Sequence, residues 1–186
     1  KLEDDDYENH FNGVAALGVI PVLLNGTCNW FAIDVDDYSI DHFILAKNIF
    51  IKKIPLVHCR SKSGGAHLYA LISDFVKASD AIALAKKWCL ELGFDPKRTE
   101  IFPKQTKFDT PEAKGNWIII PYFSGAKALD FAIDENGKKV DFEDFAKFAR
   151  ARVITPEEFH AAIKNDNVKS LSQDEIWAQS PPCIIE

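Results

Sequence analysis

The sequence predicts an α+β fold, in which a sheet-forming body extends to about residue 134 and a helical tail follows it. The chain has 186 residues, of which 47% are hydrophobic, and this is enough for one sizeable core. Short apolar runs bounded by turn residues fill most of the body, a pattern typical of strands. Beyond it, helix-start signals predominate. We therefore expect a core domain over residues 1–134 and a helical extension over 135–186 that packs on it.

The beginning of the body indicates a lead-in, a strand and a turn. Residues 1–12 are acidic and polar and are expected to form a loose lead-in. The apolar stretch 14–24 predicts a strand. Asn25-Gly26 tolerates the positive φ angles of a hairpin turn, so the chain is expected to return along 29–35.

Helix caps and apolar patterns locate the next elements. Ser39 is the expected N-cap of a helix over 40–51. The run 117–122 is almost continuously apolar, which predicts a central strand covered on both faces. The other elements expected in the body are strands at 56–59, 67–72, 100–102 and 128–133, and a helix at 79–92 that ends before Gly93.

The extension carries start and stop signals of helices. Its aromatic residues Phe142, Phe145 and Phe148 repeat at a helical spacing that is most simply core packing. The signals are Asp141 before a helical stretch to 152, capping boxes at 155–158 and 172–175, and a stop at Pro181-Pro182.

The net charge of −6 argues against a protein that binds nucleic acid through its whole surface. A local basic groove is compatible with it, and so is an ordinary solvated face of mixed charge. The basic residues that cluster in sequence are Lys52, Lys53, Arg60 and Lys62, and then Lys97, Arg98, Lys104 and Lys107.

No apolar run approaches the length of a membrane span and no leader-like segment opens the chain, so a soluble, cytoplasmic protein is expected. The chain begins at Lys1 and contains no methionine, which suggests part of a longer protein. The cysteines lack the spacing of zinc sites and are expected to be reduced thiols. They are Cys28, Cys59, Cys89 and Cys183.

Two aspartates at alternate positions end the apolar run Phe31-Ala32-Ile33-Asp34-Val35-Asp36. In a strand, Asp34 and Asp36 share a face and stand roughly 6.6 Å apart. Two parallel carboxylates repel each other unless a cation lies between them, and such oxygen ligands suit Mg²⁺ or Mn²⁺. The alternative is a strand end that simply becomes polar where it meets solvent. A third acid, Glu100, introduces another short strand.

The loop within Cys59–Tyr69 combines glycines with cationic residues. Gly64 and Gly65 free the backbone to turn N–H groups toward an anion. His67, just beyond them, is able to donate a hydrogen bond to a phosphate oxygen. The simpler alternatives are a tight turn and a structural histidine. The side chains that add positive charge or a hydroxyl group are Arg60, Lys62 and Ser63.

Two further polar segments flank strand ends. The segment Phe102-Pro103-Lys104-Gln105 adds a cationic and an amide side chain, and Gly115-Asn116 adds a second amide. The alternative is a polar connection between strands.

In this order the pieces resemble the archaeo-eukaryotic primase superfamily. The motifs are Asp-Val-Asp, then Ser-Gly-Gly-Ala-His about thirty residues later, then an acid-bearing strand followed by Phe-Pro-Lys-Gln and Gly-Asn-Trp. They are most similar to the primase-polymerase branch of phages, plasmids, CRISPR-associated systems and TOTE-type conflict systems. The resemblance covers about His10 to Phe123 and includes the run "LGVIPVLLNGTCNWFAIDVD".

The resemblance implies a catalytic core built on an RRM-like sheet. Asp34 and Asp36 fall on the first motif, which holds the divalent metals, and Glu100 is the candidate for the third motif. That motif is more commonly aspartate, so Asp95 and Asp109 are alternatives. Ser63 and His67 fall on the second motif, which contacts the incoming triphosphate. The remaining residues implied in nucleotide binding are Arg60, Lys62, Gly64, Gly65, Lys104, Gln105 and Asn116.

The implied function is template-directed nucleotidyl transfer with two Mg²⁺ or Mn²⁺ ions. Nucleoside or deoxynucleoside triphosphates would be the substrates, and single-stranded DNA would serve as template with a primer. A helicase or a further C-terminal domain of the longer protein is a possible partner. The alternatives are an RRM-like nucleic-acid-binding module without catalysis and a metal-dependent nuclease or phosphohydrolase.

Overall fold

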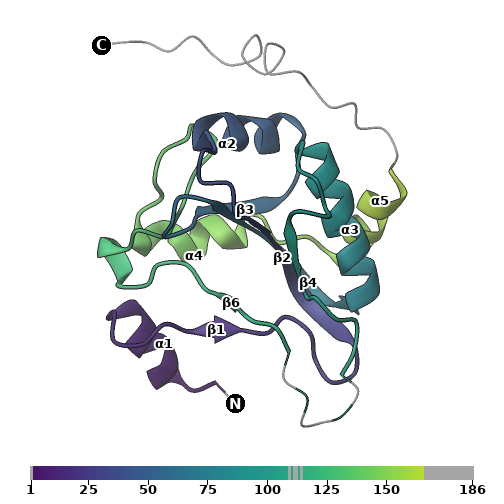
Figure 1. The fold of residues 1–186 in the computed structure, drawn as a ribbon, viewed down its shortest axis with the longest axis horizontal. Coiled ribbons are helices and arrows are strands. Elements are labelled where there is room, and N and C mark those ends of the chain that lie inside the picture. The colour runs from purple at the N-terminus through teal and green to yellow at the C-terminus, as the bar shows by residue number, and fades with distance from the viewer. Residues whose placement is uncertain (1, 109, 111–112, 114, 166–186) are drawn as a thin grey trace.

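The computed structural model describes residues 2–108, 110, 113 and 115–165. Its centre is a five-stranded sheet in the order β5-β2-β4-β3-β7, and every neighbouring pair of strands is antiparallel. Helices pack on this sheet (Figure 1), so the predicted α+β class is confirmed. The sheet strands are β2 (Thr27–Val35), β3 (Leu56–Arg60), β4 (Ala66–Lys77), β5 (Glu100–Phe102) and β7 (Phe131–Ala132).

The chain visits four of these strands in a β-α-β-β-α-β order. Helix α2 (His42–Ile51) connects β2 to β3, a hairpin connects β3 to β4, and α3 (Ala78–Glu91) connects β4 to β5. The first and third strands of the series therefore pair at the centre, with the fourth and second outside them. This is the split arrangement of ferredoxin-like and RRM-like sheets.

The two faces of the sheet bury different sets of side chains. Along β2, Phe31 and Ile33 belong to a large core that also contains Trp88 of α3. Ala32, one residue out of phase, belongs to a second cluster with Tyr69 of β4. This alternation follows from the period of two in an extended strand.

A second layer covers the other face of the sheet. It consists of α1 (Asp4–Phe11), β1 (Gly18–Val19), β6 (Ile118–Ile119) and α4 (Phe142–Arg150). In Figure 1, α1, β1 and β6 lie on one side of the sheet, and α2 and α3 lie on the other. The aromatic residues of α4 pack into the second cluster, as the helical spacing predicted.

The prediction for the N-terminal residues was wrong. Residues 4–11 form a helix rather than a loose lead-in, and Glu3 and Asp6 form a capping box at its start. His10 is fully buried, and both of its ring nitrogens have partners. Leu17 N–H donates to Nδ1, and Nε2 lies 3.2 Å from the carbonyl oxygen of Pro121. These bonds attach α1 to the segment that follows β6.

The stretches 14–24 and 117–122 are not long strands. Only two residues of each form a small separate sheet, β1 with β6. Gly26 has a φ of +77° in a turn between β1 and β2, as expected, but these two strands do not pair with each other: β1 pairs with β6, and β2 pairs with β4 and β5. Pro121 lacks an N–H group and Tyr122 has a φ of +67°, so the second stretch leaves extended geometry early.

The helix caps agree with the prediction at α5 but not at α2. Asp41 rather than Ser39 caps α2, and its carboxylate accepts from Phe43 N–H and Ile44 N–H. Helix α5 (Pro156–Lys164) begins with the predicted capping box, formed by Thr155 and Glu158. The second capping box at 172–175 and the stop at 181–182 lie outside the described residues.

Helix α5 belongs to the large core of the sheet. Its residue Phe159 is fully buried there and lies against Phe31. Lys87 of α3 donates through Nζ to the carbonyl oxygens of Ala162 and Ile163 at 2.8 and 3.3 Å. Cations at a helix C-terminus satisfy its unpaired carbonyl groups. Helices α4 and α5 thus pack on opposite faces of the same sheet.

Cys28, Cys59 and Cys89 are free thiols and buried, whereas Cys183 lies outside the described residues. Among the described residues, no helix has the length and apolar character that crossing a membrane requires.

Candidate active site

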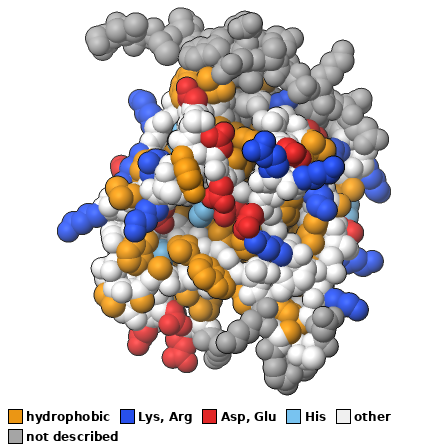
Figure 2. All heavy atoms as spheres, viewed as in Figure 1, with side chains coloured by type: hydrophobic (Ala, Val, Ile, Leu, Met, Phe, Trp, Pro, Cys, Tyr) orange, Lys and Arg blue, Asp and Glu red, His pale blue; other side chains and the backbone are white. Residues whose placement is uncertain are grey.

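Three of the predicted side chains form a row across the sheet. Asp34 of β2 stands directly opposite His67 of β4 on one side and Glu100 of β5 on the other. Directly opposite residues of antiparallel strands project from the same face, with Cβ atoms about 5 Å apart. Figure 2 shows acidic side chains near the middle of one face, close to a histidine, with Lys and Arg side chains on both sides.

His67 is oriented by a tyrosine behind it. Tyr69 Oη donates to the carbonyl oxygen of Ile119 at 2.8 Å and lies 3.2 Å from His67 Nδ1. Because the hydroxyl proton goes to Ile119, Nδ1 must donate to Tyr69, which leaves Nε2 directed toward Asp34. The distance from Nε2 to Asp34 Oδ1 is 3.3 Å, and the two side chains are only 19% and 16% exposed.

The oxygen Oδ1 of Asp34 is buried and has no hydrogen-bond partner among the described residues. The 3.3 Å contact with His67 satisfies the distance of an ion pair but not the direction of a hydrogen bond. A buried carboxylate oxygen without a donor is unfavourable, and a bound cation would satisfy it. This is the strongest local indication that the row is incomplete without a ligand.

The pKa of Asp36 is raised above its usual value. Its partial burial is the largest cause, followed by the negative charges of Asp34 and Glu100, while His67 and Lys104 act in the opposite direction. Asp36 therefore lies within electrostatic reach of the whole row. Glu100 is half exposed, and its carboxylate forms an ion pair with Lys104 Nζ at 2.8 Å.

The glycine loop lies against the end of β2. Ser61 N–H donates to the carbonyl oxygen of Gly65, which closes the hairpin between β3 and β4. A Cβ atom added to Gly65 would lie 2.3 Å from the carbonyl oxygen of Val35, the residue between the two aspartates. Only glycine permits this approach. The tertiary structure thus brings the predicted anion-binding loop beside the predicted metal ligands.

The groups of this loop are used unequally. Gly64 N–H donates to the carbonyl oxygen of Ser61 and is not free for a ligand. Lys62 and Ser63 are exposed, and their N–H groups donate to no acceptor among the described residues. Ser63 Oγ lies 3.3 Å from Ser61 Oγ, so two backbone donors and the ammonium group of Lys62 are the groups available at the tip.

Arg60 has a different position from the one expected. Its Nη1 donates to the carbonyl oxygens of Ser61 and Leu129 at 3.0 and 2.9 Å. Arg60 directly follows Cys59 in β3, so the two side chains project from opposite faces of the sheet. Cys59 faces the second cluster, on the same side as Asp34. Arg60 therefore projects from the face of the sheet opposite Asp34, and its guanidinium is bonded to backbone carbonyl groups.

Several other predicted residues are not joined to the row by a contact. Gln105 is partly buried and Asn116 is exposed, and neither forms a hydrogen bond with another described residue. Asp95, an alternative third acid, accepts from Lys97 N–H within its own turn. The other alternative, Asp109, lies outside the described residues. Of the two described candidates for the third acid, Glu100 is the one that stands opposite Asp34 in the strand register.

Two residues near the row were missed by the sequence reasoning. Asp130 is half-buried, burial raises its pKa, and His10 and His67 are within electrostatic reach of it. His42 of α2 contacts the carbonyl oxygen of Gly64. Neither has a motif, since each reaches the site through pairing of distant segments, and an acid just before a short strand was the only signal for Asp130.

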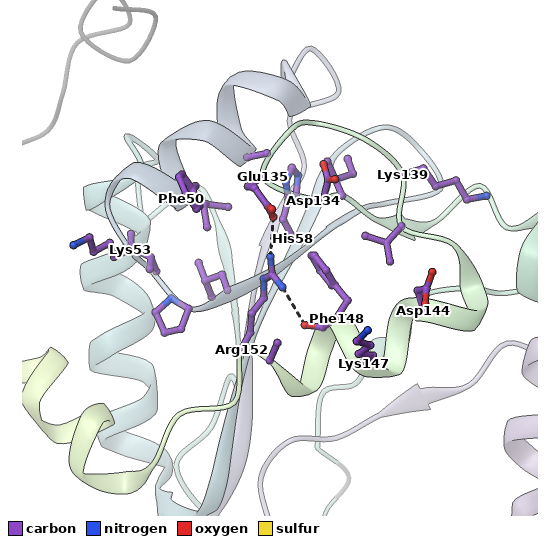
Figure 3. A pocket seen from close by; sticks show the side chains of 18 of the residues that line it. Phe50, Lys53, His58, Asp134, Glu135, Lys139, Asp144, Lys147, Phe148 and Arg152 are labelled. Carbon is purple, nitrogen blue, oxygen red and sulfur yellow. Dashed lines mark hydrogen bonds and ion pairs between the residues drawn. The ribbon is translucent and has the colours of Figure 1, made fainter. Parts of the chain in front are cut away.

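A large hollow lies elsewhere. A cavity of about 900 Å³ opens between α2, the turn after β7 and α4, and Figure 3 shows Arg152 stacked on Phe148 and paired with Glu135 inside it. Its rim carries charges of both signs, and none of the predicted site residues lines it. Volume alone therefore does not indicate where the chemistry occurs. The candidate site remains the row of Asp34, His67 and Glu100 together with the nearby Asp36, which we call the carboxylate row.

The donor set of the row suits a divalent cation. No group of three or more His, Cys, Asp or Glu side chains in the described part of the chain is already gathered as a metal site. The hard oxygen atoms of Asp34, Asp36 and Glu100 are nevertheless the ligands that Mg²⁺ and Mn²⁺ prefer. The unpartnered Oδ1 of Asp34 and the mutual repulsion of the three acids are both relieved by such an ion.

Comparison with known families identifies the family of the chain. Residues 1–152 match the family model "TOTE conflict system, Archaeo-Eukaryotic Primase domain". The chain belongs to this family. The archaeo-eukaryotic primase match contains the whole carboxylate row, the glycine loop and α4. No curated protein matches the chain. Membership of the primase family assigns the chain to a superfamily of primase-like nucleotidyltransferases.

Proposed function

We propose that this primase domain catalyses template-directed transfer of nucleotides from nucleoside or deoxynucleoside triphosphates to a primer on single-stranded DNA. The observation that carries the proposal is the shared register of Asp34 with His67 and Glu100, beside the tip of the glycine loop. Ligands for metal ions and donors for phosphate groups thus lie at one end of the same strands.

In this proposal, Asp34, Asp36 and Glu100 hold the divalent ions. When bound, the ions would lower the pKa of the primer 3′-hydroxyl and neutralise charge on the triphosphate. Tyr69 keeps the ring of His67 oriented, so that Nε2 faces Asp34 and the space beside it. The buried sheet face beneath the row shields Asp34 and His67 from water, and their side chains are only 16% and 19% exposed.

The glycine loop binds the outer phosphates. The free N–H groups of Lys62 and Ser63 and the ammonium of Lys62 suit the β- and γ-phosphates, because backbone donors and a flexible cation accommodate tetrahedral anions. Lys104, now paired with Glu100, supplies a second cation on the opposite side of the row. This concentration of donors accounts for nucleotide affinity in a chain of net charge −6.

A primer-extension assay tests the proposal. Asp34→Ala and Asp36→Ala should each reduce nucleotide incorporation by about 10²–10³-fold or more, because both remove charge that acts on the reacting phosphate. Asp74→Ala is the matched control, since this exposed aspartate lies at the far end of β4. Circular dichroism and a denaturant titration establish that each variant is folded.

Three results would contradict the proposal. Full incorporation by either aspartate variant would remove the metal assignment. Binding of single-stranded DNA without metal-dependent nucleotide binding would favour a module without catalysis. Shortening of the labelled strand without pyrophosphate release would favour a nuclease. The assay is run with Mg²⁺ and with Mn²⁺, and with both ribo- and deoxyribonucleotides.

A further inference from the structure

Two histidines connect helix α2 to the glycine loop. His42 Nε2 lies 3.0 Å from the carbonyl oxygen of Gly64, and His42 Nδ1 lies 3.0 Å from Nε2 of His58 in β3. The two rings are stacked with centroids 5.2 Å apart. His58 is 2% exposed, on the face of β3 opposite Cys59.

The position of each proton along this series of hydrogen bonds follows from its final acceptor, the carbonyl oxygen of Gly64. The carbonyl of Gly64 can only accept, so Nε2 of His42 carries a hydrogen. A neutral His42 then has a lone pair on Nδ1, and His58 must donate to it from Nε2. His58 is left with a lone pair on Nδ1, and that atom is buried and without a partner among the described residues. Burial lowers the pKa of both rings, which agrees with this doubly neutral state.

We propose that His42 is a positioning residue for the nucleotide, which holds the carbonyl of Gly64 so that the loop tip keeps the N–H groups of Lys62 and Ser63 available to the phosphates. His58 sets the tautomer of His42. The inference rests on the proposed function of the loop. It assigns a role to two residues that have no motif.

The other bonds of the loop centre on Ser61. Gly64 N–H and Arg60 Nη1 donate to its carbonyl oxygen, its N–H donates to Gly65, and its Oγ lies 3.3 Å from Ser63 Oγ. Gly64 has a φ of +106°, a region open mainly to glycine, which is also the most flexible residue. The bond from His42 restrains this residue through its carbonyl group, and it does so from a helix outside the hairpin.

Simple core packing does not explain the pair. An apolar side chain at position 58 would fill the space without a buried lone pair, and an unpaired polar atom is unfavourable. The arrangement becomes useful where a single donor must be presented in one direction. His58 provides this, because it donates to Nδ1 of His42 and so leaves the hydrogen of His42 on Nε2, which faces the carbonyl of Gly64.

The test uses three variants and a control. His42→Phe keeps the ring but removes both hydrogen bonds, His42→Gln retains an N–H donor and an oxygen acceptor, and His58→Phe removes the tautomer partner. His160→Phe, at an exposed position of α5, is the control. Calorimetry measures the affinity for a nucleoside triphosphate and for the corresponding monophosphate, each with Mn²⁺. Amide exchange is measured at Gly64, and the histidine tautomers are read from ¹⁵N shifts.

We expect His42→Phe to weaken triphosphate binding by about tenfold, the loss of roughly one well-placed hydrogen bond. Monophosphate binding should change less than threefold, because only the outer phosphates reach the loop. Exchange at Gly64 should become faster, His42→Gln should recover part of the affinity, and the wild-type spectrum should show Nε2–H on both rings.

Equal weakening of monophosphate and triphosphate binding would reduce His42 to a general structural role and overturn the inference. Unchanged exchange at Gly64 in a folded His42→Phe variant, or Nδ1–H on His42, would do the same. If the wild-type protein binds no nucleotide, the proposed function fails, whereas the tautomers and the Gly64 exchange still decide whether His42 holds the loop. If His42→Phe does not fold, the nucleotide affinity of His42→Gln and the wild-type tautomers decide whether His42 holds the loop.

Discussion

Gly65 lies so close to Val35 that a Cβ atom on the glycine would stand 2.3 Å from the valine carbonyl oxygen. This contact seats the loop between β3 and β4 directly on the strand end that carries Asp34 and Asp36. The phosphate-binding and metal-binding halves of the proposed site therefore form one unit, whose geometry depends on a single close approach of two backbones.

The first prediction concerns this approach. Gly65→Ala should lower the free energy of unfolding by about 1–3 kcal/mol, because the backbone of Val35 has no flexible end that can move aside. Chemical denaturation measures the effect. Lys62→Ala, in the same loop but exposed, should leave the unfolding free energy unchanged. Equal stability of Gly65→Ala and the wild type would show that the loop can shift away from β2.

The second prediction concerns the charge of the carboxylate row. Glu100→Gln removes a negative charge that raises the pKa of Asp36, so this pKa should fall, although burial still keeps it above its usual value. Lys104→Met removes a positive charge that lowers it, so the same pKa should rise. Carbonyl-detected NMR titration of Asp36 measures both. Shifts of the same sign in the two variants would contradict the electrostatic account of the row.

The third prediction concerns acid stability. Burial, and then the neighbouring His42, lower the pKa of His58 from 6.5 to about 3, so the folded protein binds its proton far later than the unfolded chain. The contribution of neutral His58 to the unfolding free energy is fully present above pH 6.5 and is lost as the pH falls toward 3. From about pH 7.5 to about pH 5, His58 alone should reduce the unfolding free energy by about 2 kcal/mol.

His58→Phe provides the comparison for this prediction. Its unfolding free energy should decline less steeply over the same pH range, because the titrating group is gone while the carboxylates remain. The half-buried His42, whose pKa is lowered by burial and by the charge of Arg60, contributes a smaller slope with the same sign. Identical pH profiles of variant and wild type would show that His58 is not held neutral.

The fourth prediction concerns α5, which lies beyond the family match that ends at residue 152. Phe159 is fully buried in the large core, so Phe159→Ala should reduce the unfolding free energy by about 3–5 kcal/mol. Phe75→Ala, at a half-exposed position, should cost less than about 1 kcal/mol. Similar small effects of both would indicate that α5 is peripheral to the fold.

The comparison of prediction and structure separates local from distant information. The position of β2 was legible from its apolar run, whereas the shared face of Asp34 and Asp36 stays a prediction, because β2 ends at Val35. The capping box of α5 was equally legible, because its hydrogen bonds join residues three apart. The run 117–122 was misread, since continuous apolar composition does not distinguish a central strand from a segment that covers a core.

The sequence by itself thus determined the fold class, most element positions and the residue types of the candidate site, because these depend on contacts within a few residues. Only the tertiary structure decided that Glu100 and His67 flank Asp34, that Arg60 turns to backbone carbonyls, and that His42 reaches Gly64. Register and neighbour choice are set by the packing of whole layers, and this packing joins segments whose local patterns carry no record of each other.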